Sequence, residues 1–127
     1  MTAADWTLAP ATRADAGDLM RLIEALAAYE KLSHLVVATE SDVAEALFGP
    51  RPAAEALIVR EGSENGPAIA FALYFTNFST FLGRRGLWLE DLFVDPAYRG
   101  RGIGRALLEA LAATARTEGT VVSVTDG

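Results

Sequence analysis

The chain has 127 residues, 51% of them hydrophobic, which fits one small domain with a single core. It has no cysteine and one histidine, His34, so disulfides, thiolate catalysis and a histidine-rich metal site are excluded, and His34 is interpreted as an ordinary loop residue. The formal net charge of −6 argues against nonspecific nucleic-acid binding, which depends on lysine and arginine neutralising phosphates.

The first third of the chain is predicted to form a strand and two helices. Trp6–Pro10 has the composition of a short strand that the proline closes. An amphipathic helix is predicted from Asp15 to about Leu32, because apolar residues recur there at helical spacing. Thr39 and Asp42 resemble a capping box, which predicts a second, short helix that Gly49-Pro50 ends.

The middle third is predicted to be antiparallel strands. Ala56–Arg60 and Ala68–Thr76 are strand-like, and the turn chemistry of Gly62–Gly66 between them predicts a hairpin. Residues Asn77–Gly86 are predicted to form a loop. A further strand is predicted over Leu87–Val94, ended by Asp-Pro.

The last third adds a helix and one more strand. Gly102 to about Thr117 is amphipathic, and Thr120–Thr125 then begins a strand. A strand, helix, strand unit of this kind is expected to be a parallel crossover. We therefore predict one domain over residues 1–127, of the α/β class, with a mixed sheet and helices on its faces.

Neither a membrane span nor a secretory signal is predicted. The longest uninterrupted apolar run is Ala68–Phe75, far short of the roughly 20 residues that a spanning helix needs. The segment Met1–Trp6 lacks the basic head and apolar stretch of a signal peptide. We therefore expect a cytoplasmic protein with no membrane partner.

A glycine-rich segment, Arg99-Gly-Arg-Gly-Ile-Gly-Arg-Ala106, lies between a predicted strand and a predicted helix. Three alternating glycines leave the backbone N–H groups open to an anionic oxygen, and the helix dipole favours negative charge at the same point. This pattern predicts a phosphate or pyrophosphate site. The alternative is a flexible turn with solvated arginines.

Two other phosphate-binding loops do not fit this segment. A P-loop requires Gly-Lys-Ser/Thr, and no Lys-Ser or Lys-Thr pair occurs in the chain. In a dinucleotide fingerprint, Gly-x-Gly-x-x-Gly/Ala, the last position would be Arg105 counting from Gly100, or Leu107 counting from Gly102.

The segment from Val94 to Ala106 resembles the cofactor motif of the GNAT superfamily of N-acetyltransferases, Gln/Arg-x-x-Gly-x-Gly/Ala, with Arg99, Gly102 and Gly104 at its fixed positions. The resemblance implies acetyl-CoA as co-substrate, without a metal. It also implies that loop amides hold the pyrophosphate and that strand backbone pairs with the pantetheine arm. The residues implied are Gly100, Arg101, Gly102, Ile103, Gly104 and Arg105 in the loop with Arg99 before them, and Leu92, Phe93 and Val94 in the strand.

Four further stretches resemble a narrower group, the spermidine/spermine and thialysine acetyltransferases. They are Leu26-Ala-Ala-Tyr-Glu-Lys, Ala46-Leu-Phe-Gly, Phe78-Ser-Thr-Phe-Leu-Gly-Arg and Leu89-Glu-Asp-Leu-Phe-Val. The resemblance implies acetyl transfer to a primary amine of a small molecule, which would be a polyamine, a diamine or a thialysine-like compound. It also implies a homodimer.

Three residues are candidates for binding or deprotonating the amine substrate. The resemblance implies that Glu90 helps to take a proton from the substrate ammonium, which must become neutral before its nitrogen can attack a thioester. Tyr29 and Glu30 fall where the family places substrate contacts. The alternatives stay open: Glu90 or Glu30 as a surface charge, and Tyr29 as a helix-end core aromatic.

The match to the family continues to its fifth strand, where Thr125 and Asp126 are expected to contact the amine. Beyond Gly127 the family carries a helix with the tyrosine that serves as general acid, and then a final hairpin. None of Tyr29, Tyr74 and Tyr98 matches that tyrosine. We therefore expect a GNAT fold lacking its C-terminal helix and hairpin. Two alternatives to an active enzyme are an acyl-CoA-binding protein and a subunit that a partner completes.

Overall fold

The sheet has five strands in the order β1-β2-β3-β4-β5, in a computed structural model that describes residues 5–118 and 122–124. The first four pair antiparallel, and the last pairs parallel to β4, so the sheet is mixed as predicted. The strands are β1 (Trp6–Pro10), β2 (Glu55–Glu61), β3 (Ala68–Ser79), β4 (Arg84–Val94) and β5 (Val122–Val124).

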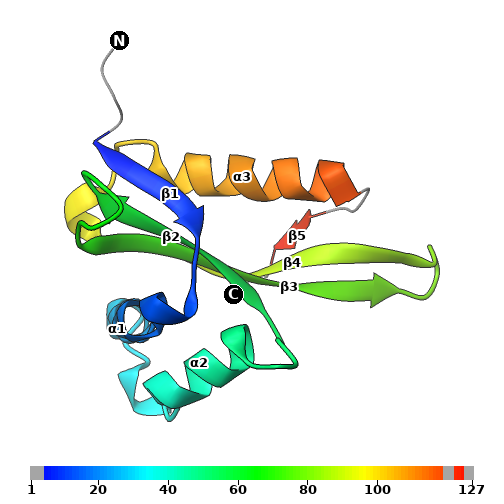
Figure 1. Cartoon of the computed structure of the whole chain (residues 1–127), viewed down its shortest axis with the longest axis horizontal. Helices are drawn as coiled ribbons and strands as arrows, with labels where there is room; N and C mark the ends of the chain where they lie inside the picture. The colour runs from blue at the N-terminus through cyan, green and yellow to red at the C-terminus, as the bar shows by residue number, and fades with distance from the viewer. Residues whose placement is uncertain (1–4, 119–121, 125–127) are drawn as a thin grey trace.

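Helices cover both faces of this sheet (Figure 1). One face carries α3 (Ile103–Glu118), and the other carries α1 (Ala16–Tyr29) and α2 (Glu40–Phe48). Three single turns of 3₁₀ helix, η1, η2 and η3, complete the described elements at Arg13–Asp15, Ser33–Leu35 and Pro96–Tyr98. No helix among the described residues is long and apolar enough to cross a membrane.

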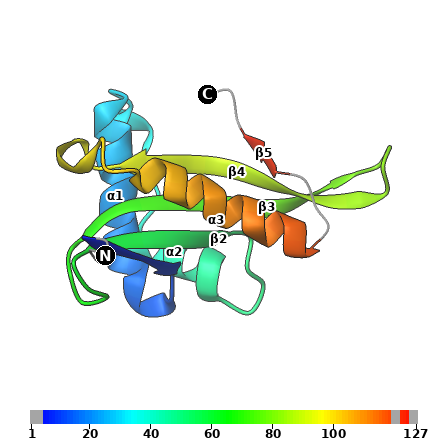
Figure 2. The same cartoon turned by 90° about the horizontal axis from the view of Figure 1, so that it is seen from above.

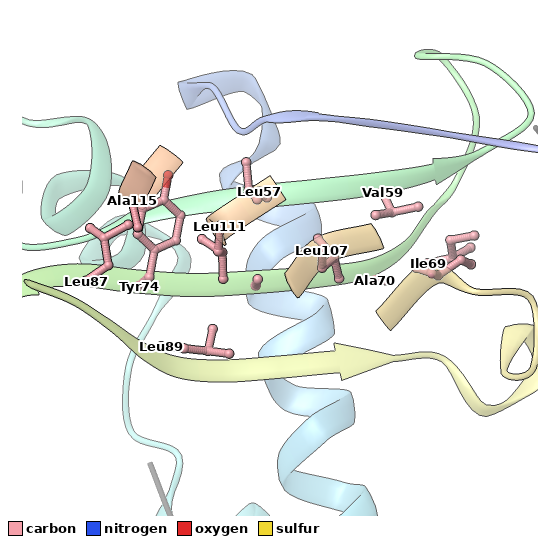
Figure 3. Packing of buried hydrophobic residues seen from close by; sticks show 12 residues of the cluster. Leu57, Val59, Ile69, Ala70, Tyr74, Leu87, Leu89, Leu107, Leu111 and Ala115 are labelled. Atoms are coloured by element: carbon pink, nitrogen blue, oxygen red, sulfur yellow. The ribbon is translucent and has the colours of Figure 1, made fainter. Parts of the chain in front are cut away.

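Each face of the sheet has its own hydrophobic cluster. Under α3, Leu107 and Leu111 are fully buried against Leu57, Val59 and Leu89 of the sheet (Figure 3). This burial follows from the predicted apolar stripe of the helix. On the opposite face α1 and α2 contribute Leu19, Leu22, Val43 and Leu47, which pack with Ile58, Phe71 and Phe93.

The first helix ends at Tyr29, three residues before the predicted end. Leu32 N–H donates to Ala27 O at 2.7 Å and Lys31 N–H donates to Ala28 O at 3.1 Å, the two bonds of a Schellman motif. Lys31 holds the left-handed position of that motif with φ of 60°. Glycine usually takes this position. Because lysine takes it here, the sequence carries no glycine that would indicate the end of the helix.

The second helix begins as its sequence predicts. Asp42 N–H donates to Thr39 Oγ1 at 3.2 Å, and Thr39 N–H donates to Asp42 Oδ2 at 2.9 Å. These two bonds form a capping box. Gly49 is the residue at which the helix stops, as predicted.

The predicted loop over Asn77–Gly86 is wrong, because β3 and β4 continue into it as a long hairpin (Figure 1). β3 runs on to Ser79 and β4 starts at Arg84, which leaves only four residues in the turn. Gly83, with φ of +66°, donates its N–H to Ser79 O at 2.8 Å and closes the turn. The extension exposes apolar side chains, including all of Phe81.

Candidate functional site

The glycine-rich loop follows β4 and lines a pocket that is open to solvent. Gly100 and Gly102 both have φ of +81°, a backbone conformation that other residues rarely adopt. A Cβ atom built on either glycine would meet no heavy atom within 4 Å, so the space in front of the loop is open. The pocket has a volume of about 280 Å³ and is lined by Val94, Tyr98, Arg99, Gly100, Gly102, Ile103, Gly104 and Arg105.

The start of α3 supplies hydrogen-bond donors to this pocket. Gly102 O accepts the first bond of the helix, from Ala106 N–H at 3.0 Å. The N–H groups of Ile103, Gly104 and Arg105 precede that bond, and the first N–H groups of a helix have no partner within the helix. They lie at the positive end of a helix dipole, which suits an anionic oxygen.

A second, larger pocket of about 430 Å³ lies between α1 and residues 33–38. It is lined by Glu24, Ala28, Ser33, Val36 and Ala38. Its one charged lining residue is an acid, so it is unsuited to an anion despite its size. The chemistry of the linings therefore favours the smaller pocket as the phosphate site.

Two arginines of the loop stack on tyrosines. The Arg99 guanidinium lies 4.5 Å from the centre of the Tyr29 ring, and Arg101 lies 5.1 Å from that of Tyr98. Arg99 also donates from Nη1 to Tyr29 Oη at 2.9 Å and from Nε to Val94 O at 3.3 Å. The loop is thus attached to the end of α1 and to the end of β4.

The fifth strand pairs with only part of β4. Val122–Val124 of β5 pair with Leu87–Leu89, and no other part of β4 pairs with the described residues of β5 (Figure 2). Within the described residues, the backbone edge of β4 from Glu90 to Val94 has no partner strand on that side. These four steps along the strand span roughly 13 Å and lead to the pocket. An extended ligand can pair with such an edge.

A β-bulge in β4 includes Glu90. Leu89 pairs with Tyr74 and Asp91 with Leu73, which leaves Glu90 as the extra residue. Before the bulge Leu87 and Leu89 belong to the cluster under α3, and after it Leu92 and Val94 do. The side-chain alternation therefore shifts by one residue, and it places Glu90 and Asp91 together on the face that α1 covers.

Asp91 is the carboxyl group of the site with a perturbed pKa. Burial raises the pKa of Asp91, and the charges of Glu90 and Glu30 raise it further. Glu30 lies at the C-terminal cap of α1, so the three acids come from two elements. Perturbed carboxyl groups of this kind cluster at functional sites. The sequence pattern does not indicate Asp91, because strict alternation along a strand puts it on the opposite face from Glu90.

The structure brings most of the predicted site residues to one end of β4. Phe93 is buried under α1, whereas Leu92 and Val94 pack towards α3. Glu90 is exposed. Tyr29 is 56% exposed, so it is not a core residue, and its ring meets Phe93 edge-on with centroids 6.4 Å apart. Thr125 and Asp126 lie outside the described residues. Among the described residues, no cluster of histidine, aspartate and glutamate is suited to a metal ion.

The sequence model of the Acetyltransferase (GNAT) family matches residues 22–126. The fold is that of a GNAT-type domain, and the chain belongs to the GNAT family of acetyltransferases. It is 37% identical over 114 residues to the thialysine N-epsilon-acetyltransferase of Mus musculus, covering 86% of this chain and 66% of the mouse protein. The chain thus spans slightly less than two thirds of the length of that relative.

Two other proteins extend the comparison. A spermidine/spermine N(1)-acetyltransferase-like protein of Homo sapiens is 34% identical over 111 residues, covering 82% of this chain and 16% of the human protein. The solved ribosomal-protein-alanine N-acetyltransferase from Brucella melitensis has a TM-score of 0.75 and 24% identity, covering 96% of this chain and 80% of that one. The structural likeness supports the fold, and the sequence likeness confirms the resemblance to the diamine and thialysine group.

Proposed function

We propose that the protein is an N-acetyltransferase that moves an acetyl group from acetyl-CoA to the primary amine of a thialysine-like compound, a diamine or a polyamine. The observation that carries the proposal is the continuity of two features at the end of β4. The anion-binding loop at Gly100–Arg105 meets the strand edge at Glu90–Val94, which pairs with no strand among the described residues. One extended ligand with an anionic end fits both.

The proposed fit of acetyl-CoA uses the loop and the strand edge differently. The N–H groups of Ile103, Gly104 and Arg105 hold the pyrophosphate, because they combine free donors with the helix dipole. Backbone groups of Leu92, Phe93 and Val94 pair with the amides of the pantetheine arm. The thioester then lies near the bulge at Glu90, roughly 13 Å back along the strand.

The acids around the bulge suit a cationic amine. Burial raises the pKa of Asp91, the charges of Glu90 and Glu30 raise it further, and an ammonium group placed beside these acids relieves that repulsion. Glu90 then accepts the ammonium proton, directly or through water. The neutral nitrogen attacks the thioester carbonyl, the new C–N bond forms, the C–S bond breaks, and CoA leaves as the thiolate. The nitrogen loses its extra proton, and the thiolate takes up one proton to become the thiol.

The test is to incubate the chain with acetyl-CoA and thialysine and to follow both products. We expect one free CoA thiol for each N-acetylated thialysine found by mass spectrometry. Thialysine with its side-chain amine already acetylated is the matched control, because it offers no side-chain amine to the site. CoA binding without acetylated product would favour the acyl-CoA-binding alternative, and absence of CoA binding would overturn the proposal.

We further propose a cytoplasmic homodimer. The family resemblance suggests the dimer, and β5 is the last strand of the described sheet, a position that readily recruits another strand. The proposed use of acetyl-CoA suggests the location. Light scattering at micromolar concentration should give twice the mass of one chain, and the mass of a single chain would contradict the dimer.

A further inference from the structure

Tyr29 is fixed between two elements at the end of α1. The Schellman motif at Ala27–Leu32 ends the helix immediately after it, so the direction in which Tyr29 leaves the helix is set by backbone hydrogen bonds. The ring of Phe93, from β4, packs against the Tyr29 ring in a T-shaped arrangement, with the centroids 6.4 Å apart and an interplanar angle of 61°. Glu30, the neighbouring residue, is one of the acids that act on Asp91.

Arg99 holds Tyr29 by two different contacts. Its guanidinium stacks over the ring at 4.5 Å, and its Nη1 donates to the tyrosine hydroxyl at 2.9 Å. Seventy residues separate the two side chains in the sequence. Tertiary structure alone therefore creates this contact, which we call the Arg99–Tyr29 bridge.

The other end of the bridge is the anion-binding loop. Arg99 lines the pocket and is followed directly by Gly100, the first residue of the loop with a positive φ. Its Nε donates to Val94 O at 3.3 Å, which ties the guanidinium to the end of β4. A ligand that orders the loop consequently restricts the position of Arg99.

We propose that Arg99 is a positioning residue that couples the two substrate sites, so that CoA bound at the loop strengthens binding of the amine beside Tyr29 and Glu30. This inference rests on the proposed function. CoA fixes the loop, the loop fixes Arg99, and the Arg99–Tyr29 bridge fixes the end of α1. By linkage the amine strengthens CoA binding by the same factor.

The size of the coupling follows from the contacts in the bridge. The Tyr29 ring is 56% exposed, so the stacking belongs to the weaker range of cation–π contacts. The hydrogen bond from a charged donor adds a comparable amount. We expect CoA to tighten amine binding roughly fivefold, at the lower end of typical couplings between sites.

The experiment measures this coupling by calorimetry, with CoA and thialysine as probes because CoA carries no acetyl group and no turnover occurs. The dissociation constant of thialysine is measured without CoA and with saturating CoA. The ratio of the two is the coupling factor. We expect a factor of roughly 5 for the wild-type chain and close to 1 for Arg99→Gln. Glutamine is allowed at this position of the family motif, so the loop sequence stays within its pattern.

Two further variants separate the bridge from other effects. Arg101→Gln removes an arginine of the same loop that stacks on Tyr98 instead of Tyr29, and it should keep the coupling factor even if it weakens CoA binding. Tyr29→Leu should lower the factor as Arg99→Gln does. The double variant should lower it no further, because both changes break one bridge.

The outcomes are distinct. A coupling factor that falls with Arg99→Gln and not with Arg101→Gln supports the inference. CoA binding with an unchanged factor in Arg99→Gln overturns the inference alone and leaves Arg99 as a cofactor contact. Absence of CoA binding in the wild-type chain overturns the proposed function, and with it the inference that rests on it.

Discussion

Gly102 has a φ of +81°, which concerns the stability of the backbone. It also has open space where a side chain would project, which concerns its proposed binding role. Gly102→Ala should cost about 1 kcal/mol of stability, because alanine is strained at positive φ. The added methyl group also enters the path of the proposed pyrophosphate. CoA affinity should therefore fall at least about tenfold by calorimetry.

Gly83 provides the matched control. It has φ of +66° and equally open space, but it lies in the β3–β4 turn at the far end of the hairpin (Figure 1). Gly83→Ala should lose similar stability and keep CoA affinity. Equal CoA affinities of the two variants would remove Gly102 from the proposed site.

Glu90 is exposed at the bulge, so its replacement should affect chemistry more than folding. Glu90→Gln should leave the free energy of unfolding within about 1 kcal/mol and slow acetyl transfer by about 10²-fold or more at neutral pH. Assays with thialysine, stopped at a series of times, would measure the rate of acetyl transfer. Glu64→Gln, in the exposed β2–β3 turn, is the control and should keep it. An undiminished rate in Glu90→Gln would mean that Glu90 is a surface charge without a role in the reaction.

At the level of elements, the end of α1 contains a strained backbone conformation that a different residue would relieve. Lys31 takes the left-handed position of the Schellman motif with φ of 60°, where glycine has no steric penalty. Lys31→Gly should therefore raise the free energy of unfolding by about 0.5 to 1 kcal/mol in urea titrations. Lys31→Ala removes the same charged chain and keeps the penalty, so it should give no gain. Equal stability of the two variants would show that the backbone of Lys31 is not strained.

The same elements show what the sequence can predict. Patterns with a local cause were confirmed: the Thr39 capping box, and the apolar stripe that buries Leu107 and Leu111. The end of the first helix at Tyr29 was missed because its Schellman motif depends on hydrogen bonds that a non-glycine residue such as Lys31 also permits. The long hairpin was missed because Asn77 and Gly86 are typical of loops.

The site was predicted unevenly for a related reason. The glycines of the loop are adjacent in the sequence, so their pattern is visible there. The bulge left a weaker trace, since the apolar positions change from Leu87 and Leu89 to Leu92 and Val94 across Glu90. The Arg99–Tyr29 bridge joins residues 70 positions apart, and no local pattern indicates it. The binding roles of these residues stay predictions.

For the whole molecule, one half-buried ionic cluster joins the sheet to α1. Arg60 of β2 donates from Nη2 to Asp15 at 2.6 Å and to Asp18 at 2.9 Å, and from Nη1 to Gly66 O at 3.0 Å. Burial alone would raise the pKa of Asp15, but the Thr12 N–H and the Arg60 guanidinium outweigh it and lower that pKa below its usual 3.8. The folded state therefore favours the charged form.

This direction fixes the sign of the pH dependence. The contribution of Asp15 to stability is complete above the unfolded pKa and is lost as pH falls through the lower pKa of the folded state. Asp15→Asn should cost about 1 to 2 kcal/mol at pH 7 and flatten the decline of stability below about pH 4. Urea unfolding across this range would measure it.

The control for this cluster is the exposed pair on α3. Arg105 and Glu109 are 3.8 Å apart with side chains 84% and 71% exposed, and pairs of this kind contribute little. Glu109→Gln should change stability at pH 7 by less than about 0.5 kcal/mol. A cost as large as that of Asp15→Asn would mean that burial does not distinguish the two pairs.

The central claim is that one extended ligand, acetyl-CoA, lies along the end of β4 with its pyrophosphate on the amides that begin α3. The most direct measurement is a titration of the ¹⁵N-labelled chain with CoA, followed through the backbone amide resonances. We expect saturable shifts that are largest at Gly100–Arg105 and extend along Leu92–Val94. Shifts that gather elsewhere, for example around the pocket between α1 and residues 33–38, or no saturable shifts at all, would contradict it.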